Sequence, residues 1–288
     1  MDGPVQGPAG GVLSTAGNRI GNSLIGSAER RLGRTTSVSG SGSWSTLHFL
    51  DDDNNGGLDY SSVSGQVALN QRIDARSSAS LSAVYSTFNY GGNGSEVGRP
   101  DIETRGINLG YQRVLSRRLS VSVSAGPQWV SSSNSTLIPS SVNVAANASV
   151  SYQRGYTSAS LGFSRGVNGG SGVLPGALSD SIYGSLGHTF GRKWVASVHV
   201  GYAHTSGLTQ LATVAGPIVP VNEVYNTVFG SAQVTRAIST HFSGYASYTV
   251  QDQTNNFPLG AKNALSGTSQ TFGIGITYTP RSTRLGQF

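Results

Sequence analysis

The most restrictive feature of this sequence is a period-two alternation of apolar and small polar residues. In residues 119–131, Leu119, Val121 and Val123 alternate with serines, and residues 194–206 show the same pattern. Successive side chains of an extended chain point to opposite faces, so this period indicates β-strands with one apolar and one polar face. The sequence therefore predicts an all-β fold.

Twelve such segments follow one another from Thr35 onward. They cover approximately residues 35–50, 58–73, 78–90, 102–115, 119–131, 143–154, 156–167, 180–190, 194–206, 223–236, 240–251 and 268–279. Each is near or above the length of a tilted membrane strand, about 9–11 residues. Short connections alternate with longer ones along the chain. Short turns on one rim and long loops on the other are typical of a transmembrane β-barrel.

The charged residues support this interpretation because they avoid the middle of the segments. Most basic residues fall at the short-turn rim or in the tails, for example Arg117, Arg118 and Lys193. Most acidic residues fall at the long-loop rim, for example Asp51 and Asp101. A charge on the lipid face at the bilayer midplane costs roughly 2–4 kcal/mol. A soluble β-sandwich has no reason to sort its charges in this way.

These patterns predict a closed antiparallel transmembrane β-barrel of about twelve strands, with short periplasmic turns and longer extracellular loops. Lipid cannot satisfy an open strand edge, so the sheet must close on itself. The apolar face then meets outer-membrane lipid and the polar face lines a lumen. The clearest candidates for pore-lining residues are Ser120, Ser122, Ser124, Gln128, Ser158, Ser160, Ser197 and His199.

The last segment carries a pattern of the form polar-x-Gly-x-x-hydrophobic-x-hydrophobic. Thr271, Gly273, Ile276 and Tyr278 meet it, and the chain ends on the aromatic Phe288. This resembles the assembly signal in the final strand of bacterial outer-membrane β-barrels. The resemblance is to the broad, porin-like class. It implies insertion into the outer membrane of a Gram-negative cell by the barrel-assembly machinery, and an even strand number would leave both termini periplasmic.

The chain divides into three parts on this interpretation. Residues 1–34 form an N-terminal periplasmic tail or a lumenal plug, residues 35–280 form the barrel, and residues 281–288 form a C-terminal tail. Within the first part, Ile20, Leu24 and Ile25 share a face of a short helix predicted over residues 18–32. The Met1 end has no positive region followed by an apolar core, so export requires a signal that has been removed.

The composition of the chain argues against several other structures and functions. The chain has no cysteine, which excludes disulfides and thiolate metal sites. The net charge of +6 is not concentrated among aromatic residues on one face, so nucleic-acid binding is not expected. No apolar run reaches the roughly 18 residues of a membrane helix.

Two small constellations could carry chemistry. Asp51, Asp53 and Asn55 match the start of a calcium loop, but the twelfth position holds Ser62 where a bidentate glutamate is needed. A polar hairpin tip explains them better. Ser197 and His199 share a strand face, but no third residue can be placed to orient the histidine. We therefore expect no metal, no cofactor and no enzymatic activity.

The leading hypothesis is a narrow porin-like channel for the passive diffusion of small polar solutes. One alternative is a non-conducting barrel that anchors or docks a partner, either a second copy or another envelope protein. Another is an autotransporter-like translocator. The apolar loop at residues 208–221 could constrict the lumen, cap it or contact a partner.

Overall fold

The computed structural model describes residues 19–50, 59–91, 101–169, 174, 176–209, 211–213, 218–220, 223–256 and 266–278. All of its regular elements are β-strands, and no helix occurs within these ranges. No helix that is long and apolar enough to cross a membrane is found in this part of the chain.

Thirteen strands form one sheet and two more form a small separate hairpin. The strands of the large sheet are β1 (Arg19–Arg31), β2 (Thr36–Phe49), β3 (Asp59–Arg72), β4 (Ser77–Gly91), β5 (Ile102–Ser116), β6 (Leu119–Ser132), β7 (Ser141–Arg154), β8 (Thr157–Asn168), β9 (Ala177–Phe190), β10 (Trp194–Gly207), β13 (Val224–Ala237), β14 (Phe242–Asn255) and β15 (Gly267–Tyr278). The hairpin consists of β11 (Leu211–Thr213) and β12 (Ile218–Pro220).

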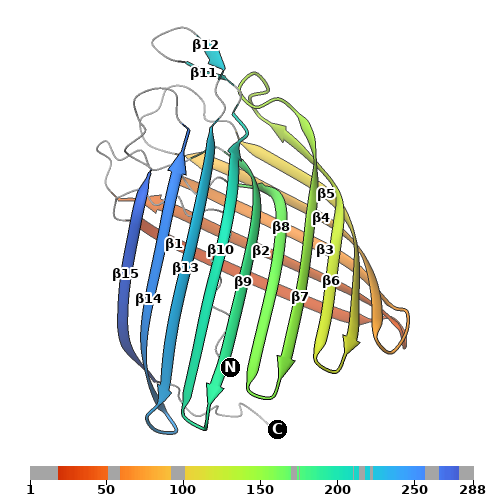
Figure 1. Cartoon of the computed structure of the whole chain (residues 1–288). Coiled ribbons are helices and arrows are strands. Elements are labelled where there is room, and N and C mark those ends of the chain that lie inside the picture. The colour runs from red at the N-terminus through yellow and green to blue at the C-terminus, as the bar shows by residue number, and fades with distance from the viewer. Residues whose placement is uncertain are drawn as a thin grey trace, which may run out of the picture.

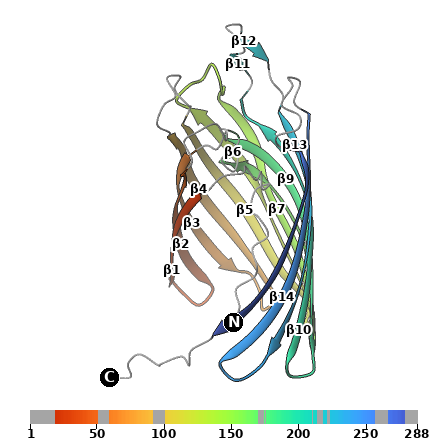
Figure 2. The same ribbon diagram turned by 90° about the vertical axis from the view of Figure 1, so that its left-hand side faces the viewer.

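The large sheet follows the chain in order, and every neighbouring pair is antiparallel. Only the β11–β12 hairpin interrupts the sequence, between β10 and β13. Figures 1 and 2 show the sheet curling into a barrel-shaped wall, with the hairpin beyond one rim. The predicted all-β antiparallel fold is therefore confirmed.

The predicted number of about twelve strands is wrong, because the described residues already form a sheet of thirteen. The additional strand is β1, which lies in the range expected to form a helix. The assignment of residues 19–31 to a tail or plug is corrected with it, since they pair with β2 along their whole length. Gly21 and Gly26 disfavour a helix, and Ser23 between them favours it only weakly, whereas the edge of β2 offers a complete ladder of hydrogen bonds.

The thirteenth strand also changes how the sheet ends. Within the described strands, β1 pairs only with β2 and β15 pairs only with β14. Both strands run from the long-loop rim to the short-turn rim, since Arg19 faces Phe49 and Tyr278 faces Phe242. The even strand number on which the parity argument rests is therefore not found in the described residues, and the placement of both termini on the periplasmic side stays a prediction. The chain termini themselves lie outside the described residues.

The two kinds of connection alternate as the sequence predicts. Two to four residues join β1 to β2, β3 to β4, β5 to β6, β7 to β8, β9 to β10 and β13 to β14. Longer segments join the strands at the opposite rim. Gly155 and Gly191 adopt positive φ angles of 56° and 61° in two of the short turns, a conformation that glycine reaches without steric cost.

The two faces of the sheet differ sharply in composition. Large apolar side chains on one face are exposed, among them Leu161, Leu186 and Val198. The other face is concave, as Figures 1 and 2 show, and beyond Arg165, where β8 no longer pairs with β7, the N–H of Val167 donates to Gln128 on β6. An apolar convex face and a polar concave face are what a lipid-embedded barrel requires.

Candidate functional site

The concave face is lined by serine hydroxyls that hydrogen-bond in pairs across neighbouring strands. Ser122 and Ser149 are 2.7 Å apart, and Ser160 and Ser185 are 2.6 Å apart. Similar pairs join β2 to β3 and β8 to β9. Each hydroxyl can both donate and accept, so these rows satisfy one another. The result is a smooth wall of short polar groups.

All the predicted pore-lining residues lie on this concave face. Ser120, Ser122, Ser124 and Gln128 alternate along β6, and Ser158 and Ser160 do so along β8. Ser197 and His199 lie on β10, where the partners of His199 are Ser185 and Ser231.

Aromatic rings on the concave face lie over glycines of the adjacent strand. A Cβ atom at Gly162 would overlap the ring of Tyr183, and one at Gly201 would overlap the ring of Phe229. A Cβ at Gly275 would lie 2.7 Å from the ring of Tyr245. The rings therefore lie along the wall rather than across the lumen. The sequence shows these glycines on the polar face but not which aromatic residue lies opposite.

A cavity of about 380 Å³ opens within this wall and spans strands β3 to β9. Its lining is dominated by amide and hydroxyl side chains. The residues that line it are Gln66, Ser82, Val84, Thr104, Gly106, Asn108, Ser124, Gln128, Ala145, Asn147, Ser164, Arg165, Gly166, Val167, Asn168, Ser179 and Ser181. Ser124 and Gln128 come from the predicted pore-lining set. The other members were not singled out from the sequence.

Several polar groups of the cavity are fixed by hydrogen bonds. The Val167 N–H donates to Gln128 Oε1 at 3.0 Å, and Asn168 Nδ2 donates to Ser179 Oγ at 2.9 Å. Ser179 also bonds to Thr205 on β10 at 3.0 Å. Asn108 differs, because its buried Oδ1 atom has no hydrogen-bond partner among the described residues. Asn108 is thus a built-in acceptor at the cavity wall.

The cavity carries little net charge. Arg165 is the only charged residue among its described lining residues. A single guanidinium nitrogen, Nη1, donates to both carboxylate oxygens of Asp180, at 2.9 and 2.8 Å. The adjacent carboxylate offsets the positive charge of the guanidinium locally.

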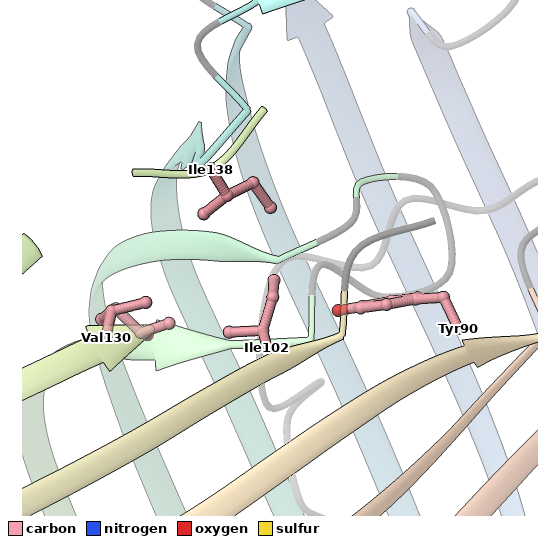
Figure 3. Close-up of a cluster of buried hydrophobic side chains, with 5 residues drawn as sticks. Tyr90, Ile102, Val130 and Ile138 are labelled. Carbon is pink, nitrogen blue, oxygen red and sulfur yellow. The ribbon is translucent and has the colours of Figure 1, made fainter. Parts of the chain in front are cut away.

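A small hydrophobic cluster lies on the rim side of the cavity. On β5, Ile102 is two residues nearer the long-loop rim than the cavity residue Thr104, and on β6 Val130 follows Gln128 in the same way. Figure 3 shows Ile102, Val130 and Ile138 gathered together, with the ring of Tyr90 directed toward them. The cluster thus covers part of the rim above the polar cavity.

Residues next to the ends of β8, β9 and β10 complete this cluster. Tyr90 donates its hydroxyl hydrogen to the carbonyl of Gly169 at 2.9 Å. Leu208 donates its N–H to the carbonyl of Gly176, which has a φ of 78°. Leu208 packs against the buried cluster. These contacts tie the end of β4 to the segments that flank β8, β9 and β10.

The remaining sequence candidates are dispersed. The calcium-loop residues Asp51, Asp53 and Asn55 lie outside the described residues, and no group of potential metal ligands occurs within the described ranges.

The residues of the assembly signal all lie on β15. Thr271 and Gly273 share the concave face, whereas Ile276 and Tyr278 share the exposed one. The Tyr278 ring centroid is 5.1 Å from that of Phe242 on β14. Phe288 lies outside the described residues.

One acidic group at the long-loop rim has a displaced pKa. Glu223 directly precedes β13 and its backbone carbonyl accepts the N–H of Gly207. Burial raises the pKa of the Glu223 carboxyl above its ordinary value, because desolvation disfavours the charged form.

No family profile and no curated protein matches the sequence. Solved structures do match the fold. The FrpB iron transporter from Neisseria meningitidis (F3-3 variant) aligns with a TM-score of 0.59 and 9% identity, over 90% of this chain and 48% of that one. The copper transporter OprC aligns with a TM-score of 0.56 and 10% identity, over 90% of this chain and 52% of that one.

The siderophore receptor PiuA from Acinetobacter baumannii aligns with a TM-score of 0.50 and 9% identity, over 82% of this chain and 47% of that one. The chain thus spans about half the length of these proteins. At such low identity the likeness concerns the fold alone. Together with the sheet described above, the comparisons identify the fold as that of the bacterial outer-membrane β-barrels.

Proposed function

We propose that this protein is an outer-membrane channel through which small polar solutes diffuse passively. The observation that carries the proposal is the polar cavity of about 380 Å³ within the concave wall. Side chains that are short, uncharged and hydrogen-bonded to one another leave room for solute and water. A filled barrel would instead place large side chains across its interior.

The arrangement of aromatic rings supports the same function. Tyr183 and Phe229 are the kind of residue that would obstruct a lumen, yet both rings lie over glycines. Paired serine hydroxyls hold the polar wall together without charge. An uncharged solute crossing such a wall can exchange water for hydroxyl and amide groups at little cost. Because charges are scarce, we expect the channel to select weakly between cations and anions.

Liposome swelling tests this function directly. Vesicles that contain the folded protein are diluted into isotonic solutions of uncharged sugars of increasing size. We expect rapid swelling with a monosaccharide and a steep decline as the sugar grows. Vesicles with the same amount of unfolded protein are the control. Swelling no faster than in that control would contradict the channel.

A docking role is the second candidate, and the free strand edges favour it. Within the described strands, β1 and β15 each have one neighbour, and Phe272, Ile274 and Ile276 on β15 are 71–88% exposed. A lipid bilayer cannot satisfy an open edge, so in the membrane these edges must pair with each other or with a partner. A second copy of the chain or another envelope protein could supply the partner.

The same edge bears on insertion into the membrane. We propose that the barrel-assembly machinery recognises β15 through Thr271, Gly273, Ile276 and Tyr278. The support is that these residues lie on a terminal strand with a free edge. Replacing Gly273 and Tyr278 together is expected to lower the amount of protein in the outer membrane without preventing refolding into detergent. Equal loss in both assays would contradict a role in assembly.

A further inference from the structure

We infer that the polar cavity is a binding site for one small, uncharged, polyhydroxylated solute of the size of a monosaccharide. The inference deepens the proposed function and rests on it, because solute reaches the cavity along the lumen. The cavity is at the small end of ligand pockets, which usually measure about 300–1,000 Å³. It therefore fits one compact molecule rather than an extended chain.

The chemistry of the lining matches hydroxyl groups. Five amide side chains border the cavity, from Gln66, Asn108, Gln128, Asn147 and Asn168. Amides and hydroxyls each carry both donors and acceptors. A sugar hydroxyl also both donates and accepts, so it can bond to this wall in many orientations. The apolar side chain of Val84 also borders the cavity and offers surface to the C–H groups of the same molecule.

The same lining disfavours ions. Transfer of a charged group out of water is costly unless an opposite charge or several oriented dipoles compensate it. The only charged lining residue that the structure describes is Arg165, and Asp180 holds its guanidinium in two hydrogen bonds. An anion would therefore have to compete with the Asp180 carboxylate already in place, and a cation would meet no carboxylate among the described residues that line the cavity.

Asn108 gives the site a specific anchor. Its Oδ1 atom is buried yet accepts no hydrogen bond from the described residues. A buried acceptor without a donor is unfavourable, by roughly 1–3 kcal/mol. Because Oδ1 has almost no accessible surface, a hydroxyl group entering the cavity can supply that donor once the Asn108 amide turns toward it. The neighbouring amide of Gln128 is held by Val167, so the site is partly preorganised.

Equilibrium dialysis with labelled glucose tests the inference on the folded, detergent-solubilised protein. We expect saturable binding with one site per chain. Gluconate and glucosamine have nearly the same size but carry a negative and a positive charge. Binding of either at an affinity equal to that of glucose would overturn the preference for uncharged solutes, and the absence of saturable glucose binding would overturn the site.

The variant Asn108→Ala locates the site. Loss of one hydrogen bond is expected to weaken glucose binding about three- to tenfold. Asn70→Ala is the matched control, because Asn70 lies on the same concave face but bonds to Ser39 outside the cavity. Equal weakening in the two variants would overturn the assignment to this cavity. If Asn108→Ala does not fold, Ser124→Ala removes a different lining group and is expected to weaken binding in the same direction.

The experiment also separates this inference from the channel itself. Saturable glucose binding without liposome swelling would contradict the channel but leave the binding site intact. Swelling without saturable binding would support the channel and overturn the binding site.

Discussion

Gly162, Gly201 and Gly275 each lie beneath an aromatic ring of the adjacent strand on the concave face. The absence of a Cβ atom lets each ring lie along the wall. Any side chain at these positions would push the ring away from the wall. The ring would then move into the lumen, where there is free space. Single glycines therefore influence both the packing of the wall and the width of the lumen that the proposed channel would use.

The variant Gly201→Ala tests this role. The added methyl group overlaps the ring of Phe229, so we expect destabilisation of about 1–3 kcal/mol, as for other overpacked sites, together with a smaller conductance. Gly65→Ala is the control, because a Cβ there meets no atom within 4 Å. Guanidinium unfolding in detergent and single-channel recording measure the two effects. Wild-type values for both in Gly201→Ala would contradict this account.

Glu223 predicts a pH dependence of stability. Its folded-state pKa is raised by burial above the ordinary 4.5, so the folded protein holds this proton at higher pH than the unfolded chain. The stabilisation is present below pH 4.5 and is lost as pH rises through the folded pKa. Glu223→Gln is expected to reduce the fall in unfolding free energy between pH 4 and pH 7. Identical slopes in the variant and the parent protein would contradict the prediction.

At the scale of single residues, the sequence predicts which residues face the lumen. It does not predict which residues lie opposite one another on neighbouring strands. The period of two assigns Ser120 and His199 to the polar face, and the structure places both on the concave side. It cannot reveal that Tyr183 lies over Gly162 or that Asn108 Oδ1 has no donor among the described residues. Those facts depend on the register between strands, which the sequence of a single strand does not contain.

At the scale of elements, β1 is where sequence reasoning failed. Ile20 and Leu24 are four residues apart and suggest a helical face, but the glycines and serines between and beyond them fit a strand equally well. The free edge of β2 decides between the two. The other strand segments were located correctly because their alternation is longer and their turns are marked by glycine or basic residues.

Hydrogen exchange tests the assignment of β1 and β15 as edge strands. In an antiparallel edge strand, every second amide points to the single neighbour and the others point away. We therefore expect alternating protection along β1 and β15 in detergent, and continuous protection along the central strand β10, which pairs with β9 and β13 from Trp194 to Ser206. Continuous protection in β1 would show that another strand covers its free edge.

At the scale of the whole molecule, the two rims are chemically different. The acidic long-loop rim carries the hydrophobic cluster of Tyr90, Ile102 and Val130, and the short-turn rim carries most of the basic residues. This sorting was visible in the sequence because the charges keep out of the strand centres. How the first and last strands would pair to close the barrel could not be predicted. It depends on whether the strand number is odd or even, and therefore on whether one marginal segment, residues 19–31, joins the sheet.

The thirteen-stranded sheet poses the question of closure in the membrane. The strands β1 and β15 run in the same direction, so pairing them would need a parallel ladder. Antiparallel closure would require β15 to reach β2 in place of β1. Either arrangement, or a partner strand, would satisfy the edges that lipid cannot.

Single-channel conductance of the refolded protein in a planar bilayer tests the central claim most directly. The account predicts steady openings of small conductance with weak selectivity between potassium and chloride, because the described cavity wall is polar and nearly uncharged. Silence from protein whose circular dichroism confirms a folded β-sheet would contradict the channel. That result would direct attention to the free edges and the long-loop rim as docking surfaces.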